Sequence, residues 1–241
     1  MLLEHLCQVR YTSNMQHNFQ TTSYPIVLTH LGSVRCIIVG GGEVGQRKAS
    51  ELVASGARPL IISPRLTSVL TTWVESKTID HLARGYQVGD LAGAFLVIAA
   101  TDDPEVNAAV AEEAAAVGAL VNIADSPDNG TFHTVATVRR GELLLTVSTG
   151  GASPMVAARI RRDLEATYGE EYGALLALLR RIRSGPLRQL SPDRRASFWR
   201  RLSLDAMLGW LAAGVHAAAE HYLERQLVRA QMDDGGVVSS Q

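Results

Sequence analysis

A glycine cluster that directly follows a short apolar run constrains the fold of this chain most. Residues 34–39 read VRCIIV, and Gly40, Gly42 and Gly45 follow with the spacing G-x-G-x-x-G. The run predicts a buried parallel strand, and the periodicity of residues 43–55 predicts a helix after it. In this context the first glycine permits a tight turn, the second admits a pyrophosphate, and the third lets helix and strand pack closely. A purely structural turn is the alternative interpretation.

Strands and helices alternate through the first half of the chain. Apolar runs predict further strands, and capping signals such as Asp103 before Pro104 predict the helices between them; the strands are expected at 59–63, 94–100 and 120–125, and the helices at 66–75 and from 104 to about 117. Residues 78–88 are ambiguous and could hold a short strand. The order predicts an α/β fold with a Rossmann-type doubly wound parallel sheet over residues 24–127.

One face of the first helix is expected to pack on this sheet. The helical spacing places on it Val44, Ala49, Leu52 and Val53. Gly56 is the expected residue just past the helix end.

The pattern changes after residue 127. Two strands joined by Arg140-Gly141 predict a hairpin, and Ser153 before Pro154 predicts the start of a helix that reaches about residue 167. Beyond Tyr168 the chain reads as helical, with start signals at Ser191 and Ser203. We therefore expect the divisions 1–23 (disordered extension), 24–127 (Rossmann domain), 128–167 (small α+β segment), 168–230 (helical domain) and 231–241 (disordered tail). Either Met1 or Met15 fits as the start.

Composition excludes several functional classes. The net charge of −1 gives no overall attraction to nucleic acid or to a membrane surface. No apolar run is long enough to span a bilayer, and the N-terminus is a poor signal peptide. Cys7 and Cys36 form no CxxC, and no His/Cys/Asp cluster marks a preformed metal site, so a cytoplasmic location is expected.

The ends of the predicted strands supply further candidates for the cofactor site. The acidic residue that normally binds the ribose is missing, and Ser63-Pro64-Arg65 stands in its place. Ser63 could bond a hydroxyl and Arg65 could attract a 2′-phosphate, so NAD and NADP both stay open. The expected cofactor-binding residues are Gly40, Gly41, Gly42, Glu43, Val44, Gly45, Ser63, Pro64, Thr101, Asp102 and Asn122. Capping is the main role expected of Asp103, and Asn122 could instead fix the local backbone.

Four stretches, in this order and near these spacings, resemble the siroheme synthase family: GGGEVGQRKA, AATDDPEVNAAV, VNIADSP and TVSTGGASP. The resemblance covers about residues 24–165 and is to the precorrin-2 dehydrogenase module, without the methyltransferase domain of the larger fused enzymes. It implies NAD-dependent oxidation of precorrin-2 to sirohydrochlorin, with Fe²⁺ insertion in some members. It also implies a homodimer formed through the segment after the nucleotide domain.

The resemblance also implies roles for single residues. Asp125 matches the proposed catalytic acid–base aspartate of the family, and it ends a strand where nicotinamide and substrate should meet. Capping of the turn before Pro127 is its alternative role. A polycarboxylate tetrapyrrole calls for arginine forks and free backbone N–H groups. The substrate-binding candidates are His133, Ser148, Thr149, Gly150, Gly151, Ser153, Arg139 and Arg159, with Arg140, Arg161 and Arg162 as further arginines. The alternative role of the arginines is solvated surface charge, and that of the turn residues is helix capping. A serine at the position of Thr149 is phosphorylated in some relatives.

Two rival functions have sequence requirements of their own. A non-catalytic NAD-sensing module would use the same glycine turn without needing Asp125. A short-chain reductase would need a Tyr-x-x-x-Lys pair, and neither Lys48 nor Lys77 has a tyrosine at that spacing.

Overall fold

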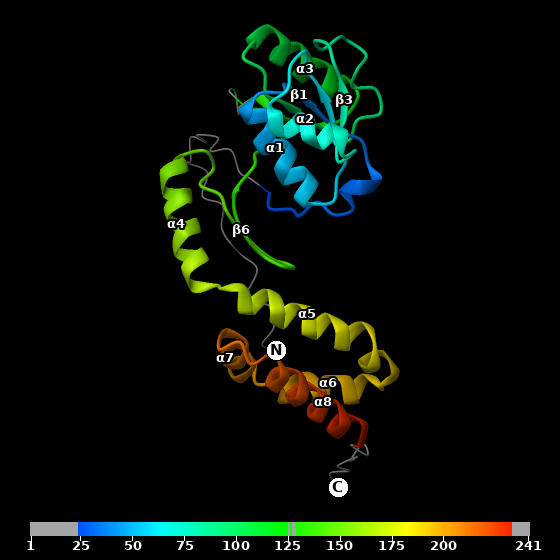
Figure 1. The fold of residues 1–241 in the computed structure, drawn as a ribbon, viewed down its shortest axis with the longest axis vertical. Coiled ribbons are helices and arrows are strands. Elements are labelled where there is room, and N and C mark those ends of the chain that lie inside the picture. The colour runs from blue at the N-terminus through cyan, green and yellow to red at the C-terminus, as the bar shows by residue number, and fades with distance from the viewer. Residues whose placement is uncertain (1–23, 125, 127–128, 233–241) are drawn as a thin grey trace, which may run out of the picture. The chain divides into compact units, whose positions relative to one another are not determined.

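The structure, a computed structural model, describes residues 24–124, 126 and 129–232. The chain separates into two compact units, Met1–Thr134 and Val135–Gln241, and each is described by itself (Figure 1). The expected extension 1–23, the catalytic candidate Asp125, the predicted boundary between 127 and 128, and residues 233–241 lie outside the described residues.

A five-stranded parallel sheet forms the centre of the first unit, in the order β3-β2-β1-β4-β5. Its elements are β1 (Cys36–Val39), α1 (Glu43–Ala54), β2 (Leu60–Ile62), α2 (Ser68–Glu75), β3 (Asp80–Leu82), β4 (Leu96–Ala99), α3 (Pro104–Ala116) and β5 (Leu120–Ile123), after a 3₁₀ turn η1 (Leu31–Ser33). The predicted Rossmann-type sheet is confirmed, and the ambiguous stretch 78–88 does contain a short strand.

Both faces of this sheet are buried, which explains the unbroken apolar runs of its strands. On β1, Ile37 and Val39 join the core cluster that includes Val110 and Ala114 of α3. The alternate residues Cys36 and Ile38 join the cluster beneath α1 and α2. Side chains that alternate across the strand therefore feed two cores, and the helices cover both faces (Figure 1).

The packed face of α1 differs from the expected one at two positions. Ala49 and Leu52 are buried as predicted, but Val44 is exposed and Lys48 is buried. Val44 lies in the first turn, where the helix faces a cavity rather than the sheet. The Lys48 ammonium donates a hydrogen bond to the hydroxyl of Thr134, and burial lowers its pKa from the ordinary value.

The second unit begins with the predicted hairpin. Strands β6 (Ala136–Arg140) and β7 (Leu143–Val147) pair antiparallel, and Gly141 takes a positive φ of 55° in the turn between them. The helices that follow are α4 (Pro154–Thr167), α5 (Glu170–Ser184), α6 (Pro192–Arg201), α7 (Leu204–Ala212) and α8 (His216–Met232), with a 3₁₀ turn η3 (Pro186–Gln189) after α5. The last helix continues past the predicted end at residue 230.

The predicted helix starts in this unit are also found. Ser153, Ser191 and Ser203 each accept a hydrogen bond from a backbone N–H of the first turn of α4, α6 and α7. Beyond α4, the helices enclose a separate core around Phe198, Met207 and Leu223. Among the described residues, no helix combines the length and the apolar character that crossing a membrane requires.

Candidate nucleotide site

The glycine turn lies where the strand order of the first sheet reverses. Strand β1 is flanked by β2 on one side and β4 on the other, so the chain leaves β1 and β4 toward opposite faces of the sheet. Ligands of open α/β sheets bind at the carboxyl ends of the strands at such a point. Hydrogen bonds from Gly40 N to Ile62 O (3.0 Å) and from Ala100 N to Val39 O (2.8 Å) tie the three strand ends together here.

Each glycine of the turn meets a different steric demand. Gly40 has a φ of +117°, and a Cβ built on it would lie 2.3 Å from the carbonyl oxygen of Ala100. A Cβ on Gly41 would lie 2.3 Å from Arg65 O, and one on Gly45 would lie 2.1 Å from Gly40 O. A Cβ on Gly42, in contrast, would meet nothing within 4 Å. The turn is therefore closed by protein backbone at three glycines and open to a ligand at Gly42.

The N-terminus of α1 faces this opening with unsatisfied donors. Gly42 is the N-cap and supplies no side-chain cap, and the first intrahelical bond is that of Gln46 N to Gly42 O (2.9 Å). The N–H groups of Glu43, Val44 and Gly45 thus have no helical acceptor, and the helix dipole adds positive potential to them. A helix start of this kind suits a phosphate group. The residues fit a dinucleotide on this ground.

The loop after β2 forms another wall of the site. Its backbone is bonded to the glycine turn through Thr67 N and Gly41 O (3.1 Å), and Thr67 Oγ1 donates to Gln46 Oε1 on α1 (2.6 Å). Ser63 is buried and its hydroxyl donates to Arg65 O (2.7 Å). The Arg65 side chain is exposed at the edge of the cavity, and within the described residues it has no hydrogen-bond or ion-pair partner. Sequence reasoning identified Ser63, Pro64 and Arg65 but missed Thr67.

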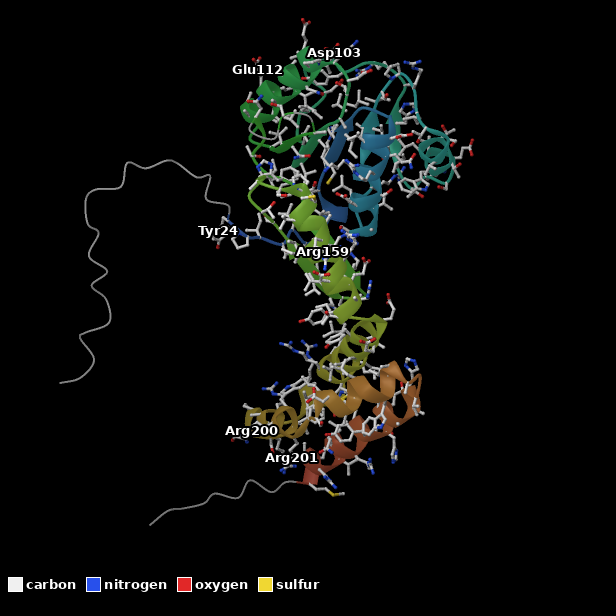
Figure 2. All side chains as sticks on the ribbon, turned by 90° about the vertical axis from the view of Figure 1, so that its left-hand side faces the viewer. Tyr24, Asp103, Glu112, Arg159, Arg200 and Arg201 are labelled. Carbon is white, nitrogen blue, oxygen red and sulfur yellow. The ribbon has the colours of Figure 1, made fainter. Side chains whose placement is uncertain are left out.

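The loop after β4 closes the opposite side. Thr101 Oγ1 donates to Asn107 Oδ1 (2.8 Å), and Asn107 Nδ2 donates back to Thr101 O (3.1 Å). Asp103 caps α3 by accepting from Glu105 N and Val106 N, as predicted, at the start of that helix (Figure 2). Asp102 is exposed beside them. These contacts fix the loop, and Thr101, Asp102 and Asp103 all line the cavity.

A third wall was not predicted from the sequence. Gly85 and Tyr86 line the cavity from the loop after β3. Tyr86 donates its hydroxyl to Glu113 on α3, and Glu113 also accepts from Gly89 N (3.0 Å) and Leu91 N (2.9 Å). Glu113 lies inside α3, away from the strand ends where site residues are expected. No sequence spacing connects it with a tyrosine in the loop after β3.

Together these walls enclose a cavity of about 740 Å³. Its lining includes most of the predicted cofactor residues: Gly40, Gly41, Gly42, Glu43, Val44, Ser63, Pro64, Thr101 and Asp102. Gly45 lies behind the turn, against the carbonyl of Gly40. The volume falls within the range of about 300–1,000 Å³ that is usual for small-molecule sites.

Asn122 lies outside the lining of this cavity. It is buried on β5, and its Nδ2 donates to Phe132 O (3.0 Å). Its Oδ1 is buried without a hydrogen-bond partner in the part of the chain that the structure describes. Asn122 was expected either to contact the cofactor or to fix the local backbone, and its bond to Phe132 O fits the second role.

The substrate candidates lie in or near the second unit. His133 is exposed at the end of the first unit. In the turn between β7 and α4, Thr149 Oγ1 accepts from Ser153 N (3.2 Å), Ser148 Oγ accepts from Gly150 N (3.2 Å), and Gly151 has a φ of 82°. Several donors of this turn are thus satisfied within the turn itself, so its capping role is visible in the structure.

The candidate arginines differ in their partners. Arg159 pairs with Asp163 on its own helix (3.1 Å), and Arg161 pairs with Glu165 (2.7 Å). The Arg140 guanidinium donates to Tyr168 O (3.0 Å) and Glu165 O (3.2 Å), which ties β6 to α4. Arg162 donates to Ala158 O (3.4 Å). Arg139 is exposed and, among the described residues, has no ion-pair partner. The described residues contain no group of three or more His, Cys, Asp or Glu side chains that could hold a metal ion.

Comparison with known proteins adds to this geometry. A family model described as "Putative NAD(P)-binding" matches residues 27–136, and one described as "Sirohaem biosynthesis protein central" matches residues 140–167. A solved structure, "SirC, precorrin-2 dehydrogenase", matches the fold with a TM-score of 0.66 and 24% identity, covering 86% of this chain and 100% of that one.

Curated relatives are more similar in sequence. The siroheme synthase of Pseudomonas putida (strain W619) is 38% identical over 206 residues, which cover 85% of this chain and 44% of that protein. The siroheme synthase of Methylobacillus flagellatus is 36% identical over 204 residues, covering 84% of this chain and 44% of that protein. The chain thus spans less than half the length of these relatives. The glycine turn and these matches show a chain that is similar, over most of its length, to one part of the siroheme synthases.

Proposed function

We propose that this chain oxidises precorrin-2 to sirohydrochlorin, with NAD as the electron acceptor. The observation that carries the proposal is the glycine turn at the point where the strand order reverses. Of its four glycines only Gly42 has open space beside it, and the uncapped start of α1 faces that opening. This turn occurs in a chain whose relatives are named siroheme synthases. Bound NAD would accept the hydride that leaves the tetrapyrrole.

The residues of the chain would hold and orient the dinucleotide. The N–H groups at the start of α1 would bind the pyrophosphate, and the Gly42 position would let it approach the backbone. The ribose would lie toward Ser63 and Arg65, at the end of β2. Because Arg65 lacks a described partner, it could also accept a 2′-phosphate, so the cofactor assay includes both NAD and NADP.

Asp125 is the proposed acid–base residue. It comes two residues after the end of β5 in the sequence, and the carboxyl ends of parallel strands meet at one edge of the sheet. Loss of a hydride and a proton from the substrate requires a group that accepts the proton, and a carboxylate can do so. The substrate carboxylates call for cationic and N–H donors, and Arg139 and the turn at 148–153 are the candidates for these contacts.

The second unit supports a proposal of homodimerisation. An isolated two-stranded hairpin is marginally stable, and α4, which packs on it, keeps Val156 44% and Ile160 40% exposed. These two side chains are one helical turn apart and form an apolar ridge. A second copy of the segment 135–167 would cover that ridge.

The direct test is turnover by the purified chain. With precorrin-2 and NAD we expect NADH absorbance and sirohydrochlorin to appear together at equal rates. Turnover with NADP in place of NAD tests whether the Arg65 guanidinium accepts a 2′-phosphate. Binding of NAD without any NADH formation would contradict the proposal and favour a nucleotide-sensing module.

The role of Asp125 is tested by Asp125→Ala. We expect turnover to fall by a factor of roughly 10²–10⁴, the usual contribution of a general acid–base group, while NAD affinity stays close to that of the parent. Asp205→Asn, in the first turn of α7, is the matched control and should retain turnover. Unchanged turnover in Asp125→Ala would remove this residue from the mechanism.

A further inference from the structure

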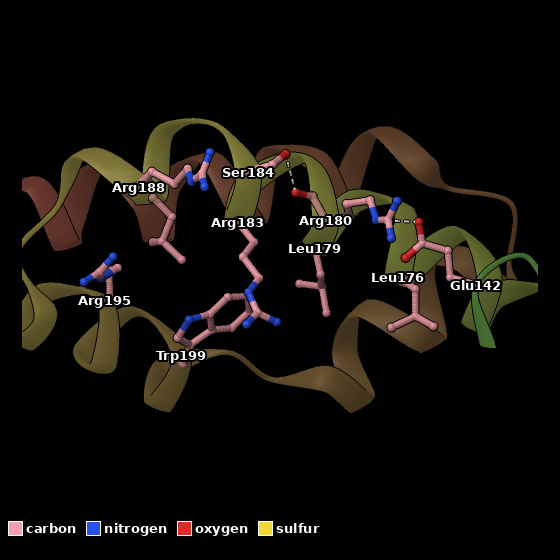
Figure 3. Close-up of a pocket in the computed structure, with 10 residues that line it drawn as sticks. Glu142, Leu176, Leu179, Arg180, Arg183, Ser184, Arg188, Arg195 and Trp199 are labelled. Atoms are coloured by element: carbon pink, nitrogen blue, oxygen red, sulfur yellow. Dashed lines mark hydrogen bonds and ion pairs between the residues drawn. The ribbon is translucent and has the colours of Figure 1, made fainter. Parts of the chain in front are cut away.

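The helical part of the second unit contains a cavity of about 1020 Å³ (Figure 3). One face of α5 lines it, through Leu176, Leu179, Arg180 and Arg183, which follow the spacing of a single helical face. The opposite wall comes from α6, and η3 contributes at one end. The volume is at the upper end of the range of about 300–1,000 Å³ for small-molecule sites, which suits a large ligand.

The middle of this cavity is apolar and aromatic. Leu187 is almost fully buried beneath it, whereas Trp199 on α6 keeps 38% of its surface exposed. Figure 3 shows Leu179 and Arg183 of α5 pointing toward Trp199 of α6. An exposed indole beside leucine side chains is a surface on which a flat apolar ring system can stack.

Positive charge surrounds this apolar surface. Arg180 is paired with Glu142 (2.6 Å). Arg183, Arg188 and Arg195 line the cavity and have no hydrogen-bond or ion-pair partner within the described residues. In Figure 3, Arg188 and Arg195 lie toward one end of the cavity, and the Arg180–Glu142 pair lies toward the other. Three unpaired guanidinium groups from three elements therefore share one hollow, where they repel one another.

Favourable interaction with a helix dipole explains the position of only one of these arginines on α5 and α6. Arg183 is in the last turn of α5, where a cation interacts favourably with the helix dipole. Arg195 is near the start of α6, where the same dipole disfavours a cation. Neutralisation by a bound anion relieves both this cost and the mutual repulsion of the guanidinium groups.

The geometry points to a binding site for a tetrapyrrole polycarboxylate in this cavity, where Trp199 stacks against the ring system and Arg183, Arg188 and Arg195 pair with its carboxylates. The choice of a tetrapyrrole rests on the proposed function, which gives the chain a ligand with this combination of a broad apolar core and carboxylates at its rim. The site is additional to the nucleotide cradle, which lies in the other unit of the chain.

The test uses the full chain and uroporphyrin, a stable tetrapyrrole polycarboxylate, as the probe. Binding is followed by equilibrium dialysis and by quenching of tryptophan fluorescence. In the double variant Arg183→Gln/Arg195→Gln we expect the affinity of this site to fall about tenfold or more, the scale set by losing two charge-assisted hydrogen bonds. In Trp199→Phe the quenching that accompanies occupancy of this site should be lost.

The matched control is Arg200→Gln. Arg200 is exposed on the same helix, does not line the cavity, and projects from the surface of the unit (Figure 2). Its loss removes one of the two positive charges that the double variant removes, without changing the cavity lining, so affinity should stay within about twofold of the parent if position rather than net charge decides binding. Melting temperatures of all variants check that they fold. Equal losses in the control and the double variant would overturn the site.

The two proposals fail in different ways. If the parent forms NADH but the double variant binds uroporphyrin as tightly as the parent does, the site in the helical part is wrong and the proposed activity stands. If no NADH forms but uroporphyrin binding depends on Arg183 and Arg195, the site stands and the proposed activity fails. A poly-glutamate peptide that displaces uroporphyrin at lower concentration than benzene-1,3,5-tricarboxylate does would assign the cavity to an acidic protein segment and overturn the tetrapyrrole proposal.

Discussion

At the scale of single residues, two glycines of the turn are needed for different reasons, one for ligand approach and one for backbone packing. Gly42 has an ordinary φ of −78° and open space where a side chain would begin. Gly45 lies inside α1, where its missing Cβ leaves room for the carbonyl of Gly40. The same residue type in one motif therefore serves two purposes, and alanine substitution can distinguish them.

We predict opposite outcomes for Gly42→Ala and Gly45→Ala. Gly42→Ala should keep the melting temperature of the parent and bind NAD at least about tenfold more weakly, because its methyl group occupies the path of the pyrophosphate. Gly45→Ala should lower the free energy of unfolding by on the order of 3 kcal/mol, because its methyl group overlaps backbone. Calorimetry of unfolding and of NAD binding measures both. Equal effects on stability would contradict the assignment.

Lys48 shows what a residue pattern could not reveal. The helical periodicity placed Val44 on the packed side, yet Val44 is exposed and Lys48 is buried, with its ammonium bonded to the Thr134 hydroxyl. Thr134 is also the last residue of the first unit. The pair could not be predicted because the two residues are far apart in the sequence and neither belongs to a motif.

At the scale of elements, Glu113 on α3 organises the loop that carries Tyr86. The carboxylate accepts the Tyr86 hydroxyl and the N–H groups of Gly89 and Leu91, and this loop forms one wall of the nucleotide site. Burial pushes the pKa of Glu113 upward, but the hydrogen bonds from Tyr86, Gly89 and Leu91 outweigh it and hold the pKa below the usual 4.5. The pKa of Asp90 in the same loop is lowered chiefly by its hydrogen bond from Arg84.

We predict that Glu113→Gln destabilises this loop and changes its pH response. An amide offers one acceptor oxygen in place of two, so unfolding free energy at neutral pH should fall by about 1–3 kcal/mol. Because folding lowers the pKa of Glu113, its contribution is present above about pH 4.5 and disappears as the pH falls through the folded value. Urea unfolding at neutral pH and below pH 4 should thus show a smaller acid-induced loss in the variant than in the parent.

A matched control for this prediction is Glu112→Gln. Glu112 is the neighbouring residue of α3 but is exposed, and the bonds from Tyr86, Gly89 and Leu91 go to Glu113 instead, so the variant should unfold with the acid dependence of the parent (Figure 2). An equally reduced acid response in both variants would show that the loop bonds of Glu113 are not its source.

At the scale of the whole molecule, the apolar ridge on α4 sets the expected assembly. In a homodimer that buries Val156 and Ile160, Ile160→Arg places an unpaired charge in the interface, which costs far more than the lost apolar contact. We predict that the dimer dissociation constant rises at least about tenfold, measured by sedimentation equilibrium.

Ala158→Arg adds the same charge to the same helix on the side away from this ridge, and should leave the association unchanged. A parent chain that sediments as a monomer at all concentrations would contradict the proposed homodimer.

The sequence by itself determined the doubly wound sheet, the hairpin and most helix starts, because apolar periodicity, glycine spacing and capping residues act over a few neighbouring positions. It also identified most of the nucleotide cradle, since the carboxyl ends of parallel strands must meet. Only the tertiary structure decided that Tyr86, bonded to Glu113 of α3, lines that site, that Lys48 is buried and bonded to Thr134, and that arginines of α5, η3 and α6 line one cavity. Each of these depends on contacts between segments distant in sequence, which no local pattern specifies.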